Sequence, residues 1–334
     1  MDDERRRWED LDTDCLTNVF SRVEMESLFL AVPFVCKSWY KTSLNPLCWK
    51  CLWFPDFIPY PLFTDKAEDR LQPAQSFGPF YDQFVDEYRI NKTRFSIDAF
   101  VKLVVDRSNG IATSLILPEF CTEEALRYVS DACPLLRGVW FTDDLVLFKN
   151  SQIIAQVIGK WKFLECLYLG SSLVKIMRQR RLSKKHLREH FKVLLTVENP
   201  PCYNVLDRIL VQIATHCKHF KELSISFCNV GEIEASTIVK LLPNLKKLDV
   251  SSSCIDRDSV VKLLQGLKKV VRFHITRCEG FEESDEEISK LGSQVKHFLC
   301  QDCANCDLSW CTIIVKQRKA IFRALELSNQ INEG

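Results

Sequence analysis

The chain has 334 residues, of which 46% are hydrophobic and 27% are charged, and its formal net charge at pH 7 is +1. This balance excludes a disordered chain and a polycation built to coat nucleic acid. No stretch approaches the roughly 20 apolar residues of a transmembrane helix, and the charged beginning MDDERRRWEDL lacks the apolar run of a signal peptide. We therefore expect no membrane or nucleic-acid partner and a location in the nucleus or cytoplasm.

The first module is predicted to span residues 8–52 and to contain three short helices. Asp12 offers a helix start, and the apolar residues that follow recur at i, i+3, i+4 and i+7; they are Leu16, Val19, Phe20 and Val23. A second helix is expected over residues 27–32, and a third is expected to open at Pro33, because proline suits a first helical turn. So short a unit carries more apolar surface than it can cover alone. The excess must face the rest of the chain or a partner protein.

This module resembles an F-box. The pattern of that family, L-P-x-x-x-L-x-x-I/V-F, an apolar segment, V-C-K-x-W and a late L-x-W, is met here except that Asp12 replaces the proline. The opening WEDL is similar to plant members. The resemblance implies a substrate receptor of an SCF-type cullin–RING ubiquitin ligase, which binds a Skp-type adaptor and, through it, cullin. The residues that the resemblance places at that interface, or directly supporting it, are Leu11, Leu16, Val19, Phe20, Leu28, Val35, Cys36 and Trp39.

Residues 53–96 are predicted to form a linker rich in proline and aromatic residues. The stretches FPDFIPYPLF and LQPAQSFGPF exclude long regular helices. Because so many large apolar side chains favour packing, we expect a rigid joint rather than a flexible tether.

Residues 97–312 are predicted to form a leucine-rich-repeat solenoid that begins with a helix at residues 97–105. Four anchor residues, Leu223, Leu248, Phe273 and Phe298, each stand 25 residues after the one before. An apolar residue three positions before each anchor and another two positions after it indicate a short strand with one buried face. The segments between these strands have apolar residues at helical spacing. One strand and one helix per unit are typical of leucine-rich repeats.

Earlier anchors are less regular. Leu115, Val139 and Leu167 continue the pattern, and Leu167 precedes Leu223 by 56 residues, which leaves room for a degraded unit near Leu194. About seven such units would stack into one solenoid, because each buries its apolar face only against its neighbours. The predicted fold class is therefore α/β, a leucine-rich-repeat solenoid preceded by a three-helix module. Residues 313–334 are expected to form a C-terminal helix and tail.

The sixteen cysteines are interpreted as reduced core thiols. Cys228, Cys278 and Cys303 each follow an anchor by five positions, where this repeat places a small polar side chain that satisfies turn backbone. Zinc bound by the four cysteines between Cys300 and Cys311 is an alternative, although paired C-x2-C knuckles normally face each other across a longer loop. The chain offers no phosphate-binding glycine loop, H-E-x-x-H or nucleophile elbow. We expect no metal, cofactor or catalytic residue.

In such a solenoid the strands line the concave face, and the residues beside each anchor point outward from it. Trp140 and Tyr168 are the best candidates for target contact, because exposed aromatic side chains are typical of binding hot spots. Alternatively, the linker or the tail covers them. Polar candidates on the same face are Lys247, Asp249, Arg272 and His274. The basic run at residues 175–190 is interpreted as a solvated insertion, with a nuclear-import signal or a polyanion site as alternatives.

Two other classes of protein remain open. A cytosolic leucine-rich-repeat scaffold or inhibitor would use the N-terminal helices only as a cap, and the two readings should differ in whether Leu16, Phe20 and Trp39 are covered in the isolated chain. A zinc-dependent or thiol enzyme would require a metal at the C-terminal cysteines or a reactive thiolate.

Overall fold

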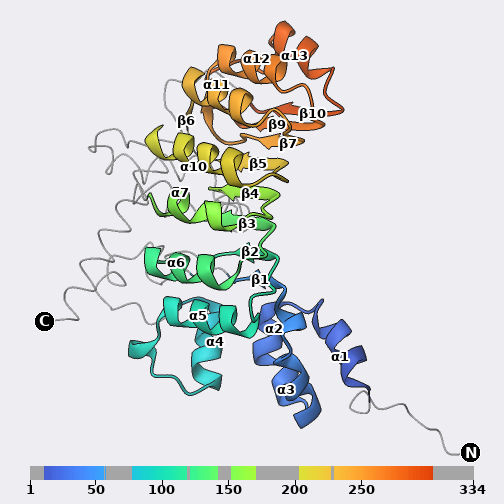
Figure 1. Cartoon of the computed structure of the whole chain (residues 1–334), viewed down its shortest axis with the longest axis vertical. Coiled ribbons are helices and arrows are strands. Elements are labelled where there is room, and N and C mark those ends of the chain that lie inside the picture. Colours follow the sequence, from blue (N-terminus) through green and yellow to red (C-terminus); the bar gives the residue numbers. More distant parts are fainter. Residues whose placement is uncertain are drawn as a thin grey trace, which may run out of the picture. The chain divides into compact units, whose positions relative to one another are not determined.

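The computed structural model describes residues 11–55, 57, 77–118, 121–141, 152–170, 203–226 and 229–303. The chain divides into two compact units, Met1–Leu136 and Arg137–Gly334 (Figure 1). Among the described residues, no helix has both the length and the apolar character needed to cross a bilayer.

Short helices build the N-terminal module of the first unit. Its elements are α1 (Thr13–Phe20), α2 (Met25–Leu30), η2 (Val32–Phe34), α3 (Lys37–Ser43) and η3 (Pro46–Trp49). Asp12 caps α1 as expected, because its carboxylate accepts a hydrogen bond from the backbone N–H of Asp14 at 3.3 Å.

The third helix begins later than the sequence predicted. Pro33 lies in the short 3₁₀ helix η2, and α3 starts at Lys37. The interruption comes from Cys36, whose backbone is extended at φ −161° and ψ 171°. Val35 and Cys36 therefore lie in the connection between η2 and α3 rather than on the face of a helix.

The module leads directly into a repeat strand that was not predicted. Strand β1 (Cys51–Trp53) pairs in parallel with β2 (Ser114–Ile116), and Leu52 stands opposite Leu115. Trp49, Leu52 and Phe54 are all buried, and their spacing of three before and two after the anchor is that of the later repeats. The signal W-x-x-L-x-F was present in the sequence but overlaps the end of the F-box pattern.

Helices complete the first unit. They are α4 (Pro79–Glu87), η5 (Lys92–Arg94), α5 (Ile97–Arg107) and α6 (Glu123–Ala132). α4 has nine residues and lies within the stretch predicted to lack long helices; Pro79 fits its first turn, where the missing N–H has no partner to lose. The predicted helix at Ile97 is confirmed, and the Ser96 hydroxyl caps it by accepting from the N–H of Ala99 at 3.3 Å.

In the described part of the second unit, the main sheet has six parallel strands in the order β3, β4, β5, β7, β9, β10. Their bounds are β3 (Gly138–Phe141), β4 (Cys166–Leu169), β5 (Glu222–Ile225), β7 (Lys247–Asp249), β9 (Arg272–Thr276) and β10 (His297–Gln301). The helices are α7 (Ile153–Val157), η7 (Ile158–Lys160), α10 (Tyr203–His216), α11 (Glu232–Leu241), α12 (Arg257–Gly266) and α13 (Glu286–Gly292). A two-stranded sheet joins β6 (Asn229–Val230) to β8 (Cys254–Ile255). Figure 1 shows α10–α13 on one side of the strands.

The strand register confirms the predicted anchors. Each anchor in this unit stands opposite the anchor of the next strand, from Val139 to Phe298. The expected extra unit near Leu194 is wrong, because β4 pairs directly with β5 and Leu167 is the partner of Leu223. Leu194 itself lies outside the described residues. The 56 residues between Leu167 and Leu223 exceed one 25-residue period by slightly more than a second period, so an insertion was mistaken for a repeat.

Small polar side chains join neighbouring repeats at the position five after the anchor. Ser253, Cys278 and Cys303 donate to the carbonyl two residues past the previous anchor, at 3.4, 3.3 and 3.1 Å. The prediction for Cys278 and Cys303 is therefore confirmed, while Cys228 lies outside the described residues. Burial raises the pKa to about 11 for the core thiols of Cys48, Cys133 and Cys217. These thiols remain protonated at neutral pH.

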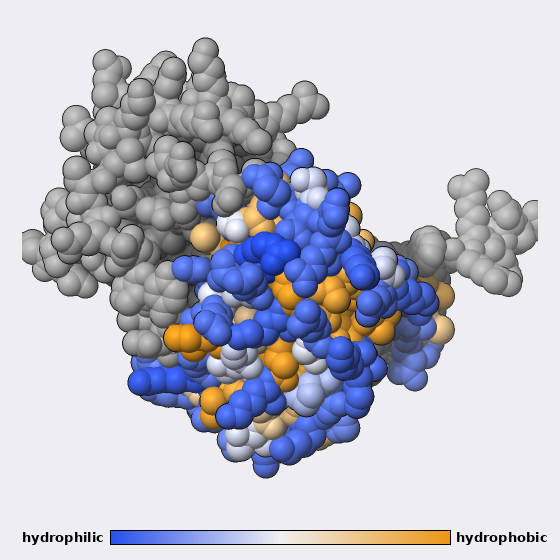
Figure 2. Space-filling model, turned by 90° about the horizontal axis from the view of Figure 1, so that it is seen from above, coloured by the Kyte–Doolittle hydropathy of each residue, from blue (hydrophilic) through white to orange (hydrophobic). Residues whose placement is uncertain are grey.

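The last strand is less covered than the inner ones. Phe298, Leu299 and Cys300 are half-buried, whereas the inner anchors Leu248 and Phe273 are buried. Figure 2 views the chain from this end and shows apolar surface bordered by hydrophilic residues. Among the described strands, β10 has a neighbour on one side only, which is β9.

Candidate functional site

Three of the eight residues predicted at the adaptor interface form the core of the N-terminal module. Leu16, Phe20 and Leu28 are 1%, 2% and 2% exposed. The ring of Phe20 packs edge-on against Trp39, with 5.2 Å between the ring centroids. These side chains hold the short helices together and are not accessible to a partner protein. Their burial does not separate a receptor from a scaffold, because the module itself covers Leu16 and Phe20.

Other apolar side chains of the module face solvent. Val19 and Val35 are 45% and 55% exposed, and Leu11, Cys36 and Trp39 are half-buried. We call the exposed set the apolar surface of the module; it consists of Val19, Phe34, Val35, Tyr40, Leu44 and Leu47. The elements that carry it are neighbours, since α3 packs against α1 and η2, and η3 packs against α1. Apolar side chains gathered outside a closed core are typical of a protein-binding surface.

A different part of the module is attached to helices of the same unit. Phe29 of α2 is fully buried, and its ring centroid lies 5.2 Å from Trp49, 5.3 Å from Phe84 of α4 and 5.3 Å from Phe100 of α5. The guanidinium carbon of Arg107 lies 4.4 Å from the centroid of the Phe29 ring and 4.9 Å from that of Trp49. We call this the Phe29 joint; it consists of Phe29, Trp49, Phe84, Phe100 and Arg107. The predicted packing of the aromatic stretch thus involves α4 and α5.

In the second unit, the residues on either side of each anchor lie on the face of the sheet opposite the helices, which we call the open sheet face. Trp140 on β3 and Tyr168 on β4 are half-buried there. Their rings stack with 4.7 Å between centroids and 7° between planes. Gly138 makes room for this arrangement, because a Cβ atom at that position would lie 2.8 Å from the Trp140 ring. We call Trp140 and Tyr168 the aromatic stack.

A carboxylate joins the aromatic stack to the polar part of the face. The Tyr168 hydroxyl donates to Glu222 Oε2 at 3.1 Å, and Lys247 Nζ lies 2.7 Å from Glu222 Oε1. Burial, followed by the negative charge of Glu222, raises the pKa of Tyr168. The phenol therefore stays protonated and keeps donating to Glu222.

The remaining predicted residues continue along the same face. Asp249 and His274 stand opposite each other on β7 and β9, as do Lys247 and Arg272. The Asp249 carboxylate accepts from the N–H of Ser251 at 2.9 Å, so its own turn holds it. Arg272 is exposed, and no described acidic residue pairs with it. The structure thus brings all six predicted target-binding side chains onto one face.

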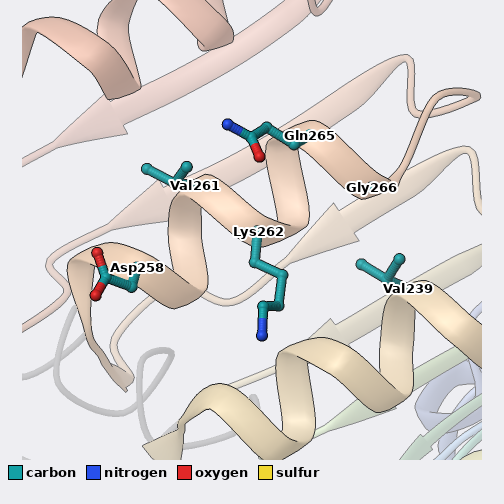
Figure 3. A pocket seen from close by; sticks show the side chains of 6 residues that line it. All are labelled: Val239, Asp258, Val261, Lys262, Gln265 and Gly266. Carbon is teal, nitrogen blue, oxygen red and sulfur yellow. The ribbon is translucent and has the colours of Figure 1, made fainter.

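A hollow of ≈ 390 Å³ lies on the helical side, between α11 and α12 (Figure 3). Lys262 of α12 points toward α11 in Figure 3, and its amine donates to Glu232 Oε1 at 2.9 Å and to Ser236 Oγ at 3.0 Å. The helices approach closely at Gly266, where a Cβ atom would lie 2.5 Å from Val239 Cγ1. The hollow is thus a consequence of helix packing, and the Lys262 amine beside it is already paired. Its lining residues are Val239, Asp258, Val261, Lys262, Gln265 and Gly266.

The zinc alternative involves cysteines at the end of the repeats. Cys300 and Cys303 are described, whereas Cys306 and Cys311 lie outside the described residues. Within the part of the chain that the structure describes, no three His, Cys, Asp or Glu side chains come together as metal ligands.

Comparisons with known proteins identify similar F-box proteins. No protein-family model matches the chain. F-box protein FBW2 of Arabidopsis thaliana is 37% identical over 311 residues, which cover 89% of this chain and 78% of that protein. An F-box/LRR-repeat protein of Arabidopsis thaliana is 26% identical over 324 residues, covering 90% and 86% of the two chains. Among solved structures, the leucine-rich repeat-containing protein LegL7 from Legionella pneumophila has a TM-score of 0.33 at 12% identity, covering 60% of this chain and 58% of that one. Its similarity to these Arabidopsis proteins, together with the register of its parallel strands, shows that this chain belongs to the plant F-box/leucine-rich-repeat proteins.

Proposed function

We propose that this chain is the substrate-recognition subunit of an SCF-type cullin–RING ubiquitin ligase. Its F-box would bind a Skp-type adaptor and, through it, cullin, while the open sheet face would bind a protein target. Ubiquitin transfer would be carried out by other subunits, and this chain would supply binding only.

The apolar surface of the module carries this proposal. A module that served only as a cap would turn its apolar side chains toward the repeats. Here the Phe29 joint already attaches the module to α4 and α5, and Val19 and Val35 take no part in that joint. Their exposure to water is unfavourable in the free chain and would be relieved by a partner.

The decisive experiment changes exposed residues rather than core residues. Leu16→Ala would remove a buried side chain at a cost of about 2–5 kcal/mol, so binding would be lost because the module unfolds. The informative variant is Val19→Asp with Val35→Asp, since both side chains are outside the core. A matched control, Val211→Asp with Ile233→Asp, places the same charge at positions 46% and 68% exposed on α10 and α11.

Binding of each full chain to a purified Skp-type adaptor is measured by isothermal titration calorimetry. Wild type and the control are expected to bind with equal affinity. The Val19/Val35 variant is expected to bind at least about a hundredfold more weakly, or about 2.7 kcal/mol, because unpaired carboxylates would enter an apolar interface. If that variant bound as tightly as wild type, or if folded wild type did not bind, the receptor proposal would be wrong. The chain would then be a leucine-rich-repeat scaffold whose N-terminal helices act as a cap, an alternative that the packing of α2 on α4 and α5 favours.

A further inference from the structure

Charge is segregated within the repeats of the second unit, although the whole chain has a net charge of only +1. Residues 242–249, 266–274 and 291–299, which lead from helices into β7, β9 and β10, contain six Lys or Arg and one acidic residue, Asp249. Residues 278–287, which follow β9, contain six Asp or Glu and no Lys or Arg. We call the six cations the basic rim; they are Lys246, Lys247, Lys268, Lys269, Arg272 and Lys296.

Most of the basic rim is exposed and lacks an acidic partner. Lys247 pairs with Glu222 at 2.7 Å, and Lys269 donates to the side-chain oxygen of Asn244 at 2.6 Å. The other four are exposed, and none has an ion pair with a described acidic residue. Their positive charge is therefore not neutralised by the described part of the chain.

Local structure accounts for only part of this charge. Lys268 and Lys269 directly follow Leu267, the C-terminal cap of α12, where the helix dipole favours a cation. Lys247 and Arg272 lie on strands, where no helix end favours them.

The strand register makes the charge at these positions unfavourable in the free chain. Arg272 on β9 stands directly opposite Lys247 on β7. Like charges that face each other across adjacent strands are destabilising. Glu222 forms an ion pair with Lys247 but not with Arg272. An anionic ligand placed over Arg272 would remove this repulsion.

We propose that the basic rim binds an acidic segment of the target protein, with a bulky apolar residue of the same segment on the aromatic stack. The inference rests on the proposed receptor function for its biological role. Tyr168 on β4 and Arg272 on β9 are three strand steps apart, which corresponds to about 14 Å at the usual strand spacing. An extended chain covers about 3.3–3.6 Å per residue. The segment therefore carries its acidic residues about four positions from its apolar residue.

The same face disfavours a nucleic acid. A nucleic-acid strand carries a phosphate at every nucleotide, and along this path it would meet the carboxylates of Glu222 and Asp249 between the aromatic stack and Arg272. A peptide can place neutral residues there and carboxylates at the rim. The unequal distribution of charge thus fits a protein segment.

The test uses a fluorescein-labelled peptide, Trp-Gly-Ser-Gly-Glu-Glu-Glu, and a second peptide with lysine in place of each glutamate. Binding to the full chain is followed by fluorescence anisotropy at low and moderate salt, since ion pairs at a surface are screened by salt. Arg272→Glu with Lys296→Glu reverses two exposed rim charges. Lys240→Glu with Lys290→Glu makes the same charge change at exposed positions on α11 and α13. A single-stranded oligouridine probe tests the nucleic-acid alternative.

Wild type and the Lys240/Lys290 control are expected to bind the acidic peptide equally. The rim variant is expected to lose at least tenfold in affinity for it and to prefer the lysine peptide, a reversal that a merely structural role would not produce. Tyr168→Ala is also expected to weaken binding. Three results would overturn the inference: no binding of the acidic peptide by wild type, an equal loss in the control, or tighter binding of oligouridine. Adaptor binding measured on the same variants keeps the two proposals apart, because the rim variant should retain it and the Val19/Val35 variant should retain the peptide.

Discussion

Phe29→Ala should detach the F-box helices from α4 and α5. The side chain is fully buried, and a buried Phe→Ala change costs about 3–5 kcal/mol. Aromatic pairs at centroid distances of 5.2–5.3 Å are formed with Trp49, Phe84 and Phe100, and such pairs contribute about 0.5–1.5 kcal/mol beyond their buried area. Arg107 would also lose one of its two ring contacts.

The expected loss is therefore at the upper end of this range, about 5 kcal/mol. This is a large fraction of the roughly 5–15 kcal/mol that stabilises a folded domain. Phe29→Leu retains much of the volume and should cost less, while Leu103→Ala on the exposed face of α5 should change stability by about 0.5 kcal/mol or less.

Hydrogen exchange followed by mass spectrometry measures the effect on each helix. In wild type, the amides of α2 and α5 should exchange with one common opening free energy, because the Phe29 joint makes them a single cooperative unit. Phe29→Ala should lower that value in both helices together. Separate opening free energies in wild type, or a loss below about 1 kcal/mol in the variant, would refute the reasoning that the joint is rigid.

Two further outcomes follow from the described contacts. Burial raises the pKa of the Cys133 thiol from 9.0 to about 11, so its stabilising contribution is complete below pH 9 and is lost as pH rises from about 9 toward about 11. In urea unfolding under reducing conditions, the difference in unfolding free energy between wild type and Cys133→Ala should narrow by up to about 1.4 kcal/mol per pH unit across that window. A difference that stayed constant with pH would contradict the raised pKa of Cys133. Gly138→Ala would bring a Cβ atom 2.8 Å from the Trp140 ring; near-ultraviolet circular dichroism should show loss of the aromatic stack with little change in stability, and an unchanged spectrum would mean that the ring does not depend on Gly138.

The repeats were predictable because each unit makes the same contacts as the next. The anchor residues repeat at a constant interval, and the register pairs them as expected. The errors arose where that regularity is broken. Between Leu167 and Leu223 the chain has an insertion whose length imitates another unit, and only the strand pairing reveals one step. At Trp49 the repeat pattern overlaps the F-box pattern, so this residue was assigned to the F-box alone and the strand anchored at Leu52 was missed.

The apolar surface of the module was harder to predict, because apolar spacing does not say which side of a short helix faces inward. Leu16, Val19 and Phe20 all fit the same helical stripe, yet Val19 is exposed and the other two are buried. The turn at Cys36 likewise places Val35 outside the core by ending regular structure before α3. Tertiary packing determines both outcomes, and neither can be derived from the periodicity of one segment.

The open sheet face presents a third case, in which the strand pattern predicts which residues are outside but not how they interact. Alternation correctly placed Trp140, Tyr168, Lys247 and Arg272 on one face. It could not show that Glu222 accepts a hydrogen bond from Tyr168 and pairs with Lys247, or that Arg272 has no described acidic partner. A cation left unpaired beside another cation weakens the free sheet. Because an acidic ligand would remove that cost, the arrangement at Arg272 supports the proposed recognition of an acidic segment.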